Sequence, residues 1–180
     1  MADAIPSFSA QRLALQGLPL RLIQDGLLDE ATMLQAIATA KEEGTNLVSY
    51  LVNAGLANPR DIAIAASQEF GVPLLDLDAV QLDLDTVKLV SDKLLTKHRV
   101  LPLVKRGKKL FLGVSDPTNL HAIDEIKFQT GLSVEAIVVD DDKLQKACDR
   151  AIEQAEAQMP SLGDDDGVDL EGLDVTGGDE

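Results

Sequence analysis

Two histidines are the residues of this sequence most able to do chemistry, because an imidazole nitrogen can bind a transition metal or exchange a proton near neutral pH. His98 and His121 have no cysteine or further histidine at the short spacings typical of metal ligands. The spacing therefore predicts no metal site. The single cysteine, Cys148, cannot form an internal disulfide and is typical of a reducing compartment.

Two polar runs are also candidates for binding or catalysis. Asp140, Asp141 and Asp142 could hold a cation, or could start the helix that follows, where carboxylates suit the positive end of the helix dipole. Residues 114–119, VSDPTN, could form an active-site loop, although such Asp-Pro runs more often turn the chain from a strand into a helix. We expect the cap and the turn.

No glycine-rich phosphate loop ending in Gly-Lys-Ser/Thr occurs in the sequence. The nearest turn, KRGKK at 105–109, lacks both the glycine spacing and the hydroxyl. We therefore predict that the chain is not an enzyme and needs no cofactor. The basic turn could dock an acidic partner, or could keep the edge of a β-hairpin soluble.

Composition excludes two further classes of partner. The formal net charge is −15, and aromatic residues make up 3% with no Trp. Such a chain repels phosphate backbones and lacks the rings on which single-stranded bases stack, so no nucleic acid is expected to bind. No stretch approaches the roughly 18 apolar residues of a membrane span, and no basic-then-apolar signal opens the chain. We expect a cytoplasmic protein without membrane insertion.

Functional side chains must be positioned by the fold. An internal repeat in the sequence predicts the first lobe of that fold. When Gly26 is aligned with Gly55, LRLIQDGLLDEATM parallels SYLVNAGLANPRDI. In each copy the glycine can end one helix in the left-handed conformation, and Asp29 or Asn58 can cap the next. Because neither pair of helices can bury its apolar face alone, the copies should pack together as a helical lobe over residues 13–72.

The second part of the sequence predicts a small α/β lobe over residues 85–157. Residues 73–84 alternate Leu with Asp and are expected to be an extended linker. Helical periodicity over 85–98 precedes a β-hairpin around the basic turn, a helix, a third strand and a closing helix. The predicted fold class is thus α+β: a helical lobe, then an α/β lobe with a β-hairpin, a third strand and two or three helices.

Both ends of the chain are expected to be disordered. Residues 1–12 form the predicted flexible N-terminus. Residues 158–180 are rich in Gly and Asp, contain no Lys or Arg, and cannot support a packed core.

Apolar residues in the first repeat outnumber what one helix face needs. All of them could be core, or some could form a protein-docking patch. The candidate docking residues are Leu18, Leu20, Leu22, Ile23, Leu27, Leu28, Met33 and Ile37.

The stretch from Val100 to Ile152 resembles the N-terminal domain of type II secretion and type IV pilus assembly ATPases. The resemblance is carried by VLPL, by GVSDPTN, by D-x-x-x-F-x-T-G from Asp124 to Gly131, and by VE-x-x-V. The helical repeat followed by GVPLLDLD resembles the region that precedes this domain in pilus extension ATPases. This implies a regulatory domain at the inner-membrane pilus base, tethered by the acidic segment to a C-terminal motor domain.

Some members of that family bind cyclic di-GMP through paired helical repeats resembling R-L-G-x-x-L-x-x-x-G-x-L. Here residues 17–19, GLP, and 46–48, NLV, stand in place of the Arg-Leu-Gly openings. The resemblance then implies a protein regulator, a PilZ-type adaptor, that docks on the helical lobe to control pilus extension and twitching motility. The motor domain and the pilus platform proteins are the other implied partners.

Two alternatives to adaptor docking remain. The chain could bind cyclic di-GMP directly, with Arg12, Arg21 or Arg60 replacing the usual arginines, or it could be a purely structural spacer.

Overall fold

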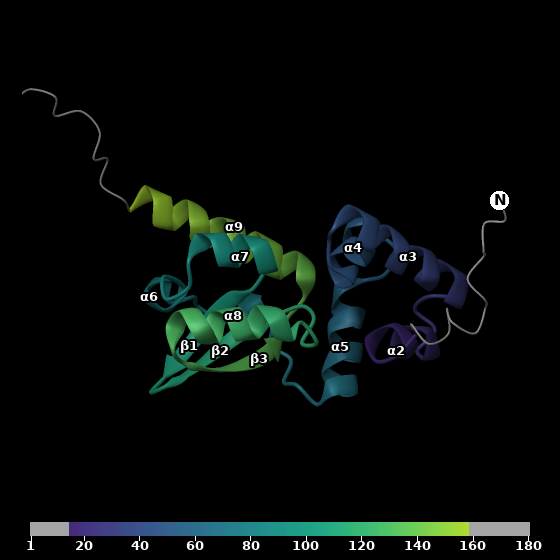
Figure 1. Cartoon of the computed structure of the whole chain (residues 1–180), viewed down its shortest axis with the longest axis horizontal. Helices are drawn as coiled ribbons and strands as arrows, with labels where there is room; N and C mark the ends of the chain where they lie inside the picture. The colour runs from purple at the N-terminus through teal and green to yellow at the C-terminus, as the bar shows by residue number, and fades with distance from the viewer. Residues whose placement is uncertain (1–14, 159–180) are drawn as a thin grey trace, which may run out of the picture.

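The computed structural model describes residues 15–158, and within them two lobes lie side by side (Figure 1). A helical lobe comes first and an α/β lobe follows, which confirms the predicted α+β class. The predictions made for residues 1–12 and for the acidic segment after residue 158 lie outside the described residues.

The helical lobe contains the helices that the repeat predicts, two from each copy. They are α2 (Leu18–Gln24), α3 (Glu30–Glu43), α4 (Leu47–Asn53) and α5 (Pro59–Phe70). Gly26 and Gly55 follow the first helix of each copy with φ of 72° and 67°. The side chains of Asp29 and Asn58 accept hydrogen bonds from backbone amides of the next turn at 2.8 and 2.9 Å. The predicted ends and starts of these helices are confirmed.

Equivalent residues of the two copies form the centre of the helical lobe. Leu22 corresponds to Leu51 and Met33 corresponds to Ile62, and all four side chains are fully buried. Each copy therefore supplies the apolar surface that the other one covers, as expected for paired repeats.

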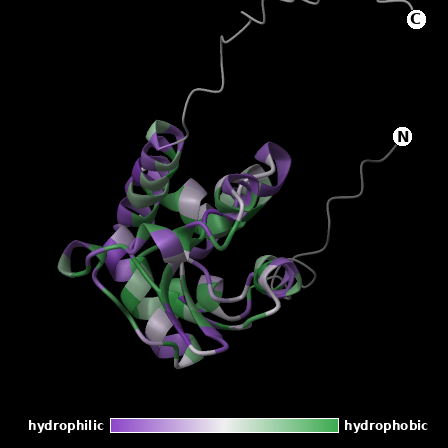
Figure 2. Cartoon of the chain, turned by 90° about the vertical axis from the view of Figure 1, so that its left-hand side faces the viewer, coloured by the Kyte–Doolittle hydropathy of each residue, from purple (hydrophilic) through white to green (hydrophobic). Residues whose placement is uncertain are grey.

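The α/β lobe is built around a three-stranded sheet in the order β1-β2-β3. The predicted hairpin pairs β1 with β2 in antiparallel register, whereas β3 runs parallel to β2 after a helical crossover. In Figure 2 the strands are largely hydrophobic, while α9, which leads to the C-terminal trace, carries much hydrophilic surface. The elements are η1 (Leu77–Ala79), α6 (Leu84–Val87), α7 (Asp92–His98), β1 (Leu101–Arg106), β2 (Lys109–Val114), α8 (Leu120–Thr130), β3 (Ser133–Val138) and α9 (Asp141–Ala157).

The helix predicted over residues 85–98 is divided in the structure, so this lobe has four α-helices rather than two or three among the described residues. The backbone of Ser91 is extended, with φ −65° and ψ 144°, and a new helix begins after it. Val87 at the end of α6 and Val90 between the two helices are both buried, and Leu95 is the fully buried leucine of α7. The break lets both short helices bury apolar residues in the same hydrophobic cluster of this lobe.

The segment predicted to be a linker, residues 73–84, is extended at its start but packs on the α/β lobe. The Leu75 amide donates to the Val138 carbonyl at 2.9 Å, and the Val138 amide donates to the Pro73 carbonyl at 2.8 Å. Lys143 on α9 binds the Asp76 and Asp78 carboxylates, each at 2.7 Å. The segment is therefore part of the folded lobe.

The two lobes share apolar contacts. Val138, at the end of β3, is fully buried and belongs to the hydrophobic cluster of the helical lobe. Helix α9 contacts both α4 and α5. Within residues 15–158, no helix combines the length and the hydrophobicity needed to cross a bilayer.

Candidate functional site

The aspartates that begin α9 lie at the boundary between the lobes. Asp140 occupies the N-cap position, as expected, but its side chain makes no capping hydrogen bond. Its carboxylate lies 3.3 Å from a guanidinium nitrogen of Arg60 on α5. Asp141 accepts a hydrogen bond from the Ser49 hydroxyl on α4 at 3.0 Å and lies 3.4 Å from a guanidinium nitrogen of Arg99. The capping interpretation was thus right about position and wrong about the side-chain contacts.

Both carboxylates are buried, with exposed fractions of 4% for Asp140 and 1% for Asp141. A buried carboxylate is costly unless hydrogen bonds and opposite charges compensate it, and removing one partner typically costs about 3–5 kcal/mol. Since Ser49 and Arg60 belong to the helical lobe, their contacts with α9 fix how the two lobes are oriented.

Arg99 combines an unusual backbone with this boundary contact. It ends α7 in the left-handed region, with φ 49° and ψ 66°, and is the only non-glycine residue in the described part of the chain with positive φ. For a side chain with a Cβ this conformation costs roughly 1–2 kcal/mol. The strained turn directs the guanidinium toward Asp141.

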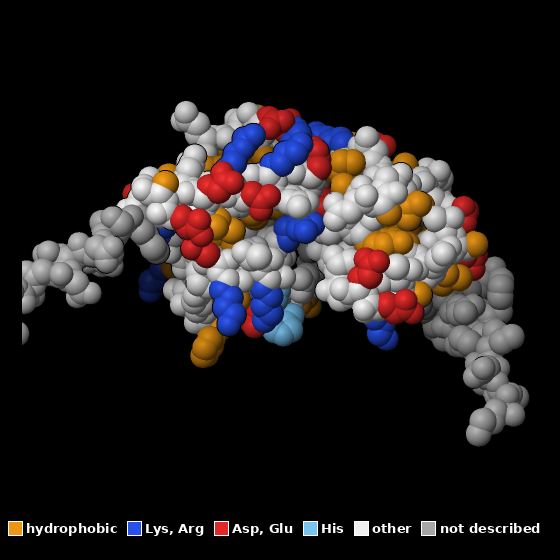
Figure 3. Space-filling model, turned by 90° about the horizontal axis from the view of Figure 1, so that it is seen from above, with side chains coloured by type: hydrophobic (Ala, Val, Ile, Leu, Met, Phe, Trp, Pro, Cys, Tyr) orange, Lys and Arg blue, Asp and Glu red, His pale blue; other side chains and the backbone are white. Residues whose placement is uncertain are grey.

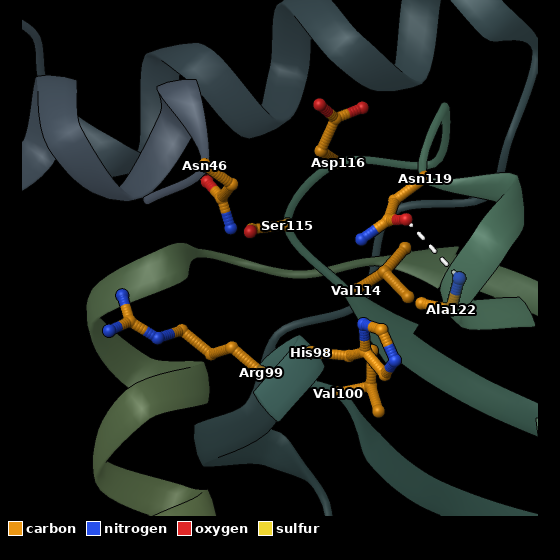
Figure 4. A pocket seen from close by; sticks show the side chains of 9 residues that line it. All are labelled: Asn46, His98, Arg99, Val100, Val114, Ser115, Asp116, Asn119 and Ala122. Atoms are coloured by element: carbon orange, nitrogen blue, oxygen red, sulfur yellow. Dashed lines mark hydrogen bonds between the residues drawn. The ribbon is translucent and has the colours of Figure 1, made fainter. Parts of the chain in front are cut away.

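A cavity of about 140 Å³ lies beside these residues (Figure 4). Asn46 from the helical lobe and Arg99, Ser115, Asp116 and Asn119 from the α/β lobe line it, together with less polar neighbours. Ligand pockets for drug-sized molecules are usually about 300–1,000 Å³. This cavity by itself is smaller than that range.

The polar run at the cavity wall is a turn, as predicted. Asp116 accepts a hydrogen bond from the Thr118 amide at 2.9 Å, and Asn119 caps α8 by accepting one from the Ala122 amide at 3.2 Å (Figure 4). The side chains of Asp116 and Asn119 therefore stabilise the turn between β2 and α8. Their hydrogen bonds are those of a turn and a helix cap, as the sequence predicted.

The candidate docking residues divide into two groups. Leu18, Leu22, Leu28 and Met33 are buried in the helical-lobe core, so these four are not available to a partner and that part of the docking assignment is wrong. They are the positions at which the repeats contact each other.

The accessible group lies on α2, on the loop after it, and on α3. Leu20 is exposed at 38%, and Ile23, Leu27 and Ile37 are partly buried. Figure 3 shows hydrophobic side chains gathered over the helical lobe on the side seen from above. Sequence reasoning did not select Leu56 and Ile64, which are also exposed on this lobe. The repeat itself pointed to Leu56, because it corresponds to Leu27.

The described arginines suggested for nucleotide binding already have partners. Arg21 donates from Nε to both Asp25 oxygens at 2.9 and 3.0 Å and from Nη2 to Gln68 at 2.7 Å. The hydrogen bonds and charge of Asp25 raise the pKa of Arg21. Arg60 is paired with Asp140. A bound nucleotide would have to compete with these carboxylates.

The fold brings the two histidines together, although their sequence spacing gave no sign of it. The ring centroids of His98 and His121 are 5.8 Å apart, and His98 Nε2 contacts the Glu125 carboxylate. Hydrogen bonds from His98 and Lys97 lower the pKa of Glu125 to about 2. Cys148 is buried elsewhere, against the Val100 carbonyl, and burial raises its pKa to about 12.

Comparison with known proteins identifies the class. The family model of the MshEN domain matches residues 70–158. The chain is 42% identical, over 168 residues, to the type IV pilus assembly ATPase PilB of Pseudomonas aeruginosa, a match covering 93% of this chain and 29% of that protein. Residues 70–158 are therefore an MshEN domain. The matched region is the MshEN domain and not an ATPase catalytic domain.

Solved structures show the same fold. A structure of MshE with cdg matches with a TM-score of 0.58 and 25% identity, covering 76% of this chain and 99% of that one. The N-terminal domain of XpsE matches with a TM-score of 0.60 and 23% identity, covering 75% and 96%. The chain thus spans most of those solved structures but under a third of the length of the PilB relative.

Proposed function

We propose that the chain is the non-catalytic regulatory domain of a type IV pilus assembly ATPase, and that a PilZ-type adaptor protein docks on its helical lobe to control pilus extension and twitching motility. On this proposal the whole protein also carries an ATPase motor domain. The domain then lies in the cytoplasm at the base of the pilus and works beside the platform proteins.

The observation that carries the proposal is the 42% identity with a pilus assembly ATPase across 93% of this chain. The docking surface is supported by Leu20, an apolar side chain left 38% exposed on α2. Exposed apolar residues of this kind become binding hot spots when a partner excludes water from them. Ile23, Leu27 and Ile37 are partly exposed and pack against the core of the same lobe.

Direct binding of cyclic di-GMP is the second candidate, and the likeness to MshE with cdg favours it. Against it, the two Arg-Leu-Gly openings are replaced by GLP and NLV. Arg21 is also paired with Asp25, and Arg60 with Asp140, so a phosphate would have to compete with these carboxylates. The missing motif arginines and the pairing of Arg21 and Arg60 with carboxylates therefore favour a protein partner over the nucleotide.

Calorimetry separates the candidates. The chain is titrated with a PilZ-type protein from the same organism, and in a second experiment with cyclic di-GMP. Adaptor heat without nucleotide heat supports the proposal. Nucleotide heat alone would establish the second candidate instead, and the absence of both would leave the spacer as the remaining interpretation.

The mapping of the contact is the second part of the test. Methyl NMR signals of Leu20, Ile23 and Ile37 should shift when the adaptor is added. The signal of Leu89, which is equally exposed at 38% but lies in the α/β lobe, serves as the internal reference. Shifts confined to Leu89 and its neighbours would mean that the adaptor binds the α/β lobe, which would contradict docking on the helical lobe.

A further inference from the structure

Three potential metal ligands converge where α7 meets α8. His121 and Glu125 are four residues apart on α8, which places them on the same face of the helix. His98 is the last residue of α7, and its ring reaches that face. One ligand atom from each of the three side chains lies within 4.8 Å of the other two.

The cluster is held firmly on one side and open on the other. The His98 side chain is only 9% exposed, and the Glu125 side chain is 32% exposed. His121 is exposed, so an ion can enter from solvent without opening the core. Lys97 also donates to the Glu125 carboxylate at 3.0 and 3.2 Å. A metal ion bound to Glu125 would take the place of this lysine charge.

We propose that His98, His121 and Glu125 form a binding site for one divalent transition-metal ion, with Zn²⁺ as the best match. Two imidazoles and one carboxylate are a ligand set that zinc accepts, with the remaining coordination position left to water. Carboxylate and imidazole together favour zinc, nickel or copper over magnesium or calcium, which prefer oxygen ligands alone.

The required movement is small. Zinc lies about 2.0–2.2 Å from nitrogen and carboxylate oxygen, so tetrahedral ligands are about 3.3 Å apart. Because no two ligand atoms are more than 4.8 Å apart, no pair has to close by more than about 1.5 Å, which rotation of the exposed His121 ring can supply. His98 Nε2 and the Glu125 carboxylate, which are already in contact, must instead move slightly apart to admit the ion, as Glu125 is released by Lys97. His98, at the end of α7, stays in place because its side chain is buried. The movement is thus limited to the side chains of His121 and Glu125.

Metal binding would join α7 to α8 through side chains. His121 and Glu125 also line a groove between these helices, beside Phe128, which is 93% exposed. The proposed ion would stiffen both walls of this groove.

The test is binding of Zn²⁺ to the metal-free full chain, measured by competition with a chromophoric chelator, and of Co²⁺, followed by its visible absorption. One ion per chain is expected, with a cobalt spectrum lacking a thiolate charge-transfer band because Cys148 is not a ligand. His121→Gln should weaken zinc binding by roughly 10-fold or more, as expected for damage to a coordination sphere. Because His121 is exposed, this variant should fold normally.

The matched control is Asp124→Asn, which removes a carboxylate from the same helix. The Asp124 side chain is 73% exposed and is not a ligand of the proposed site. Its zinc affinity should equal that of the unmodified chain. Equal affinities of the His121→Gln variant and the unmodified chain would overturn the proposal, because the bound zinc would then belong to other carboxylates. Failure to bind zinc at all would overturn it as well.

Discussion

The Ser49 hydroxyl on α4 donates a hydrogen bond to the Asp141 carboxylate on α9 across the boundary of the two lobes, at 3.0 Å. Both residues are buried, with exposed fractions of 1%. Because both side chains are shielded from solvent, this contact helps to hold the helical lobe against the α/β lobe. The orientation of the lobes therefore depends on a few buried polar atoms as well as on apolar packing.

Ser49→Ala should lower the free energy of unfolding by about 1.5–3 kcal/mol, the usual contribution of a hydrogen bond to a charged group. Urea denaturation followed by circular dichroism measures this change. Ser91→Ala is the control, because the exposed Ser91 side chain makes no capping hydrogen bond, and it should change stability by no more than about 0.5 kcal/mol. Equal stabilities of the two variants would contradict the assigned role of Ser49.

Substitutions of Arg99 separate its backbone strain from its side-chain contact. Arg99→Ala removes the guanidinium but keeps a Cβ at φ 49°. Arg99→Gly removes both the guanidinium and the steric cost of that conformation. The glycine variant should therefore be more stable than the alanine variant by about 1 kcal/mol in urea denaturation. The opposite order would mean that the left-handed turn is unstrained.

The cap of α3 should make stability depend on acid pH. Hydrogen bonds from the Thr32 amide and hydroxyl lower the pKa of Asp29 in the folded state. A carboxylate with a lowered folded pKa stabilises the fold above its unfolded pKa of about 3.9, and this stabilisation is lost as the pH falls through the folded value. Asp29→Asn should therefore be less stable than the unmodified chain at pH 7.

The difference between these two chains should shrink steadily below about pH 4, where Asp29 becomes protonated in the unmodified chain. Thermal unfolding at a series of pH values measures it. A constant difference from pH 7 to pH 3 would show that the Asp29 charge plays no part in capping α3.

Cys148 should be unreactive in the folded chain. Burial raises its pKa to about 12, so the thiolate that reacts with disulfide reagents is almost absent at pH 8. A thiol-disulfide reagent should label the native chain very slowly and the urea-unfolded chain rapidly. Fast labelling of the native chain would mean that the lobe opens often around α9.

The helical repeat was predictable because it is a local pattern repeated in the sequence. Gly26 and Gly55 marked the ends of helices, and Leu22 and Leu51 marked the core. The same pattern could not separate core leucines from accessible ones, since burial of Leu18 but not of Leu20 depends on how the second copy packs against α2.

The contacts of α9 and the histidine cluster were not predictable from spacing. Ser49 and Asp141 are 92 residues apart, and no local signal relates them. His98 meets Glu125 only because α7 and α8 pack side by side, although the four-residue step from His121 to Glu125 was visible in the sequence. A search for such helical pairs, rather than for histidine or cysteine spacings alone, would have found two of the three proposed ligands.

Leu20→Asp should abolish binding of the proposed PilZ-type adaptor while leaving the chain folded. Leu20 is exposed at 38%, so a carboxylate there stays hydrated in the free chain but is desolvated when a partner covers it. Met33→Asp is unsuitable for this purpose, because Met33 is fully buried and the substitution would unfold the helical lobe.

Calorimetry of the Leu20→Asp variant with the adaptor should detect no binding, or an affinity lower by about 30-fold or more, which corresponds to a hot spot of 2 kcal/mol. Leu89→Asp is the matched control, since Leu89 has the same 38% exposure but lies in the α/β lobe, and its adaptor affinity should be unchanged. Circular dichroism must give the same spectrum for both variants. If Leu89→Asp rather than Leu20→Asp weakened binding, the adaptor would dock on the α/β lobe.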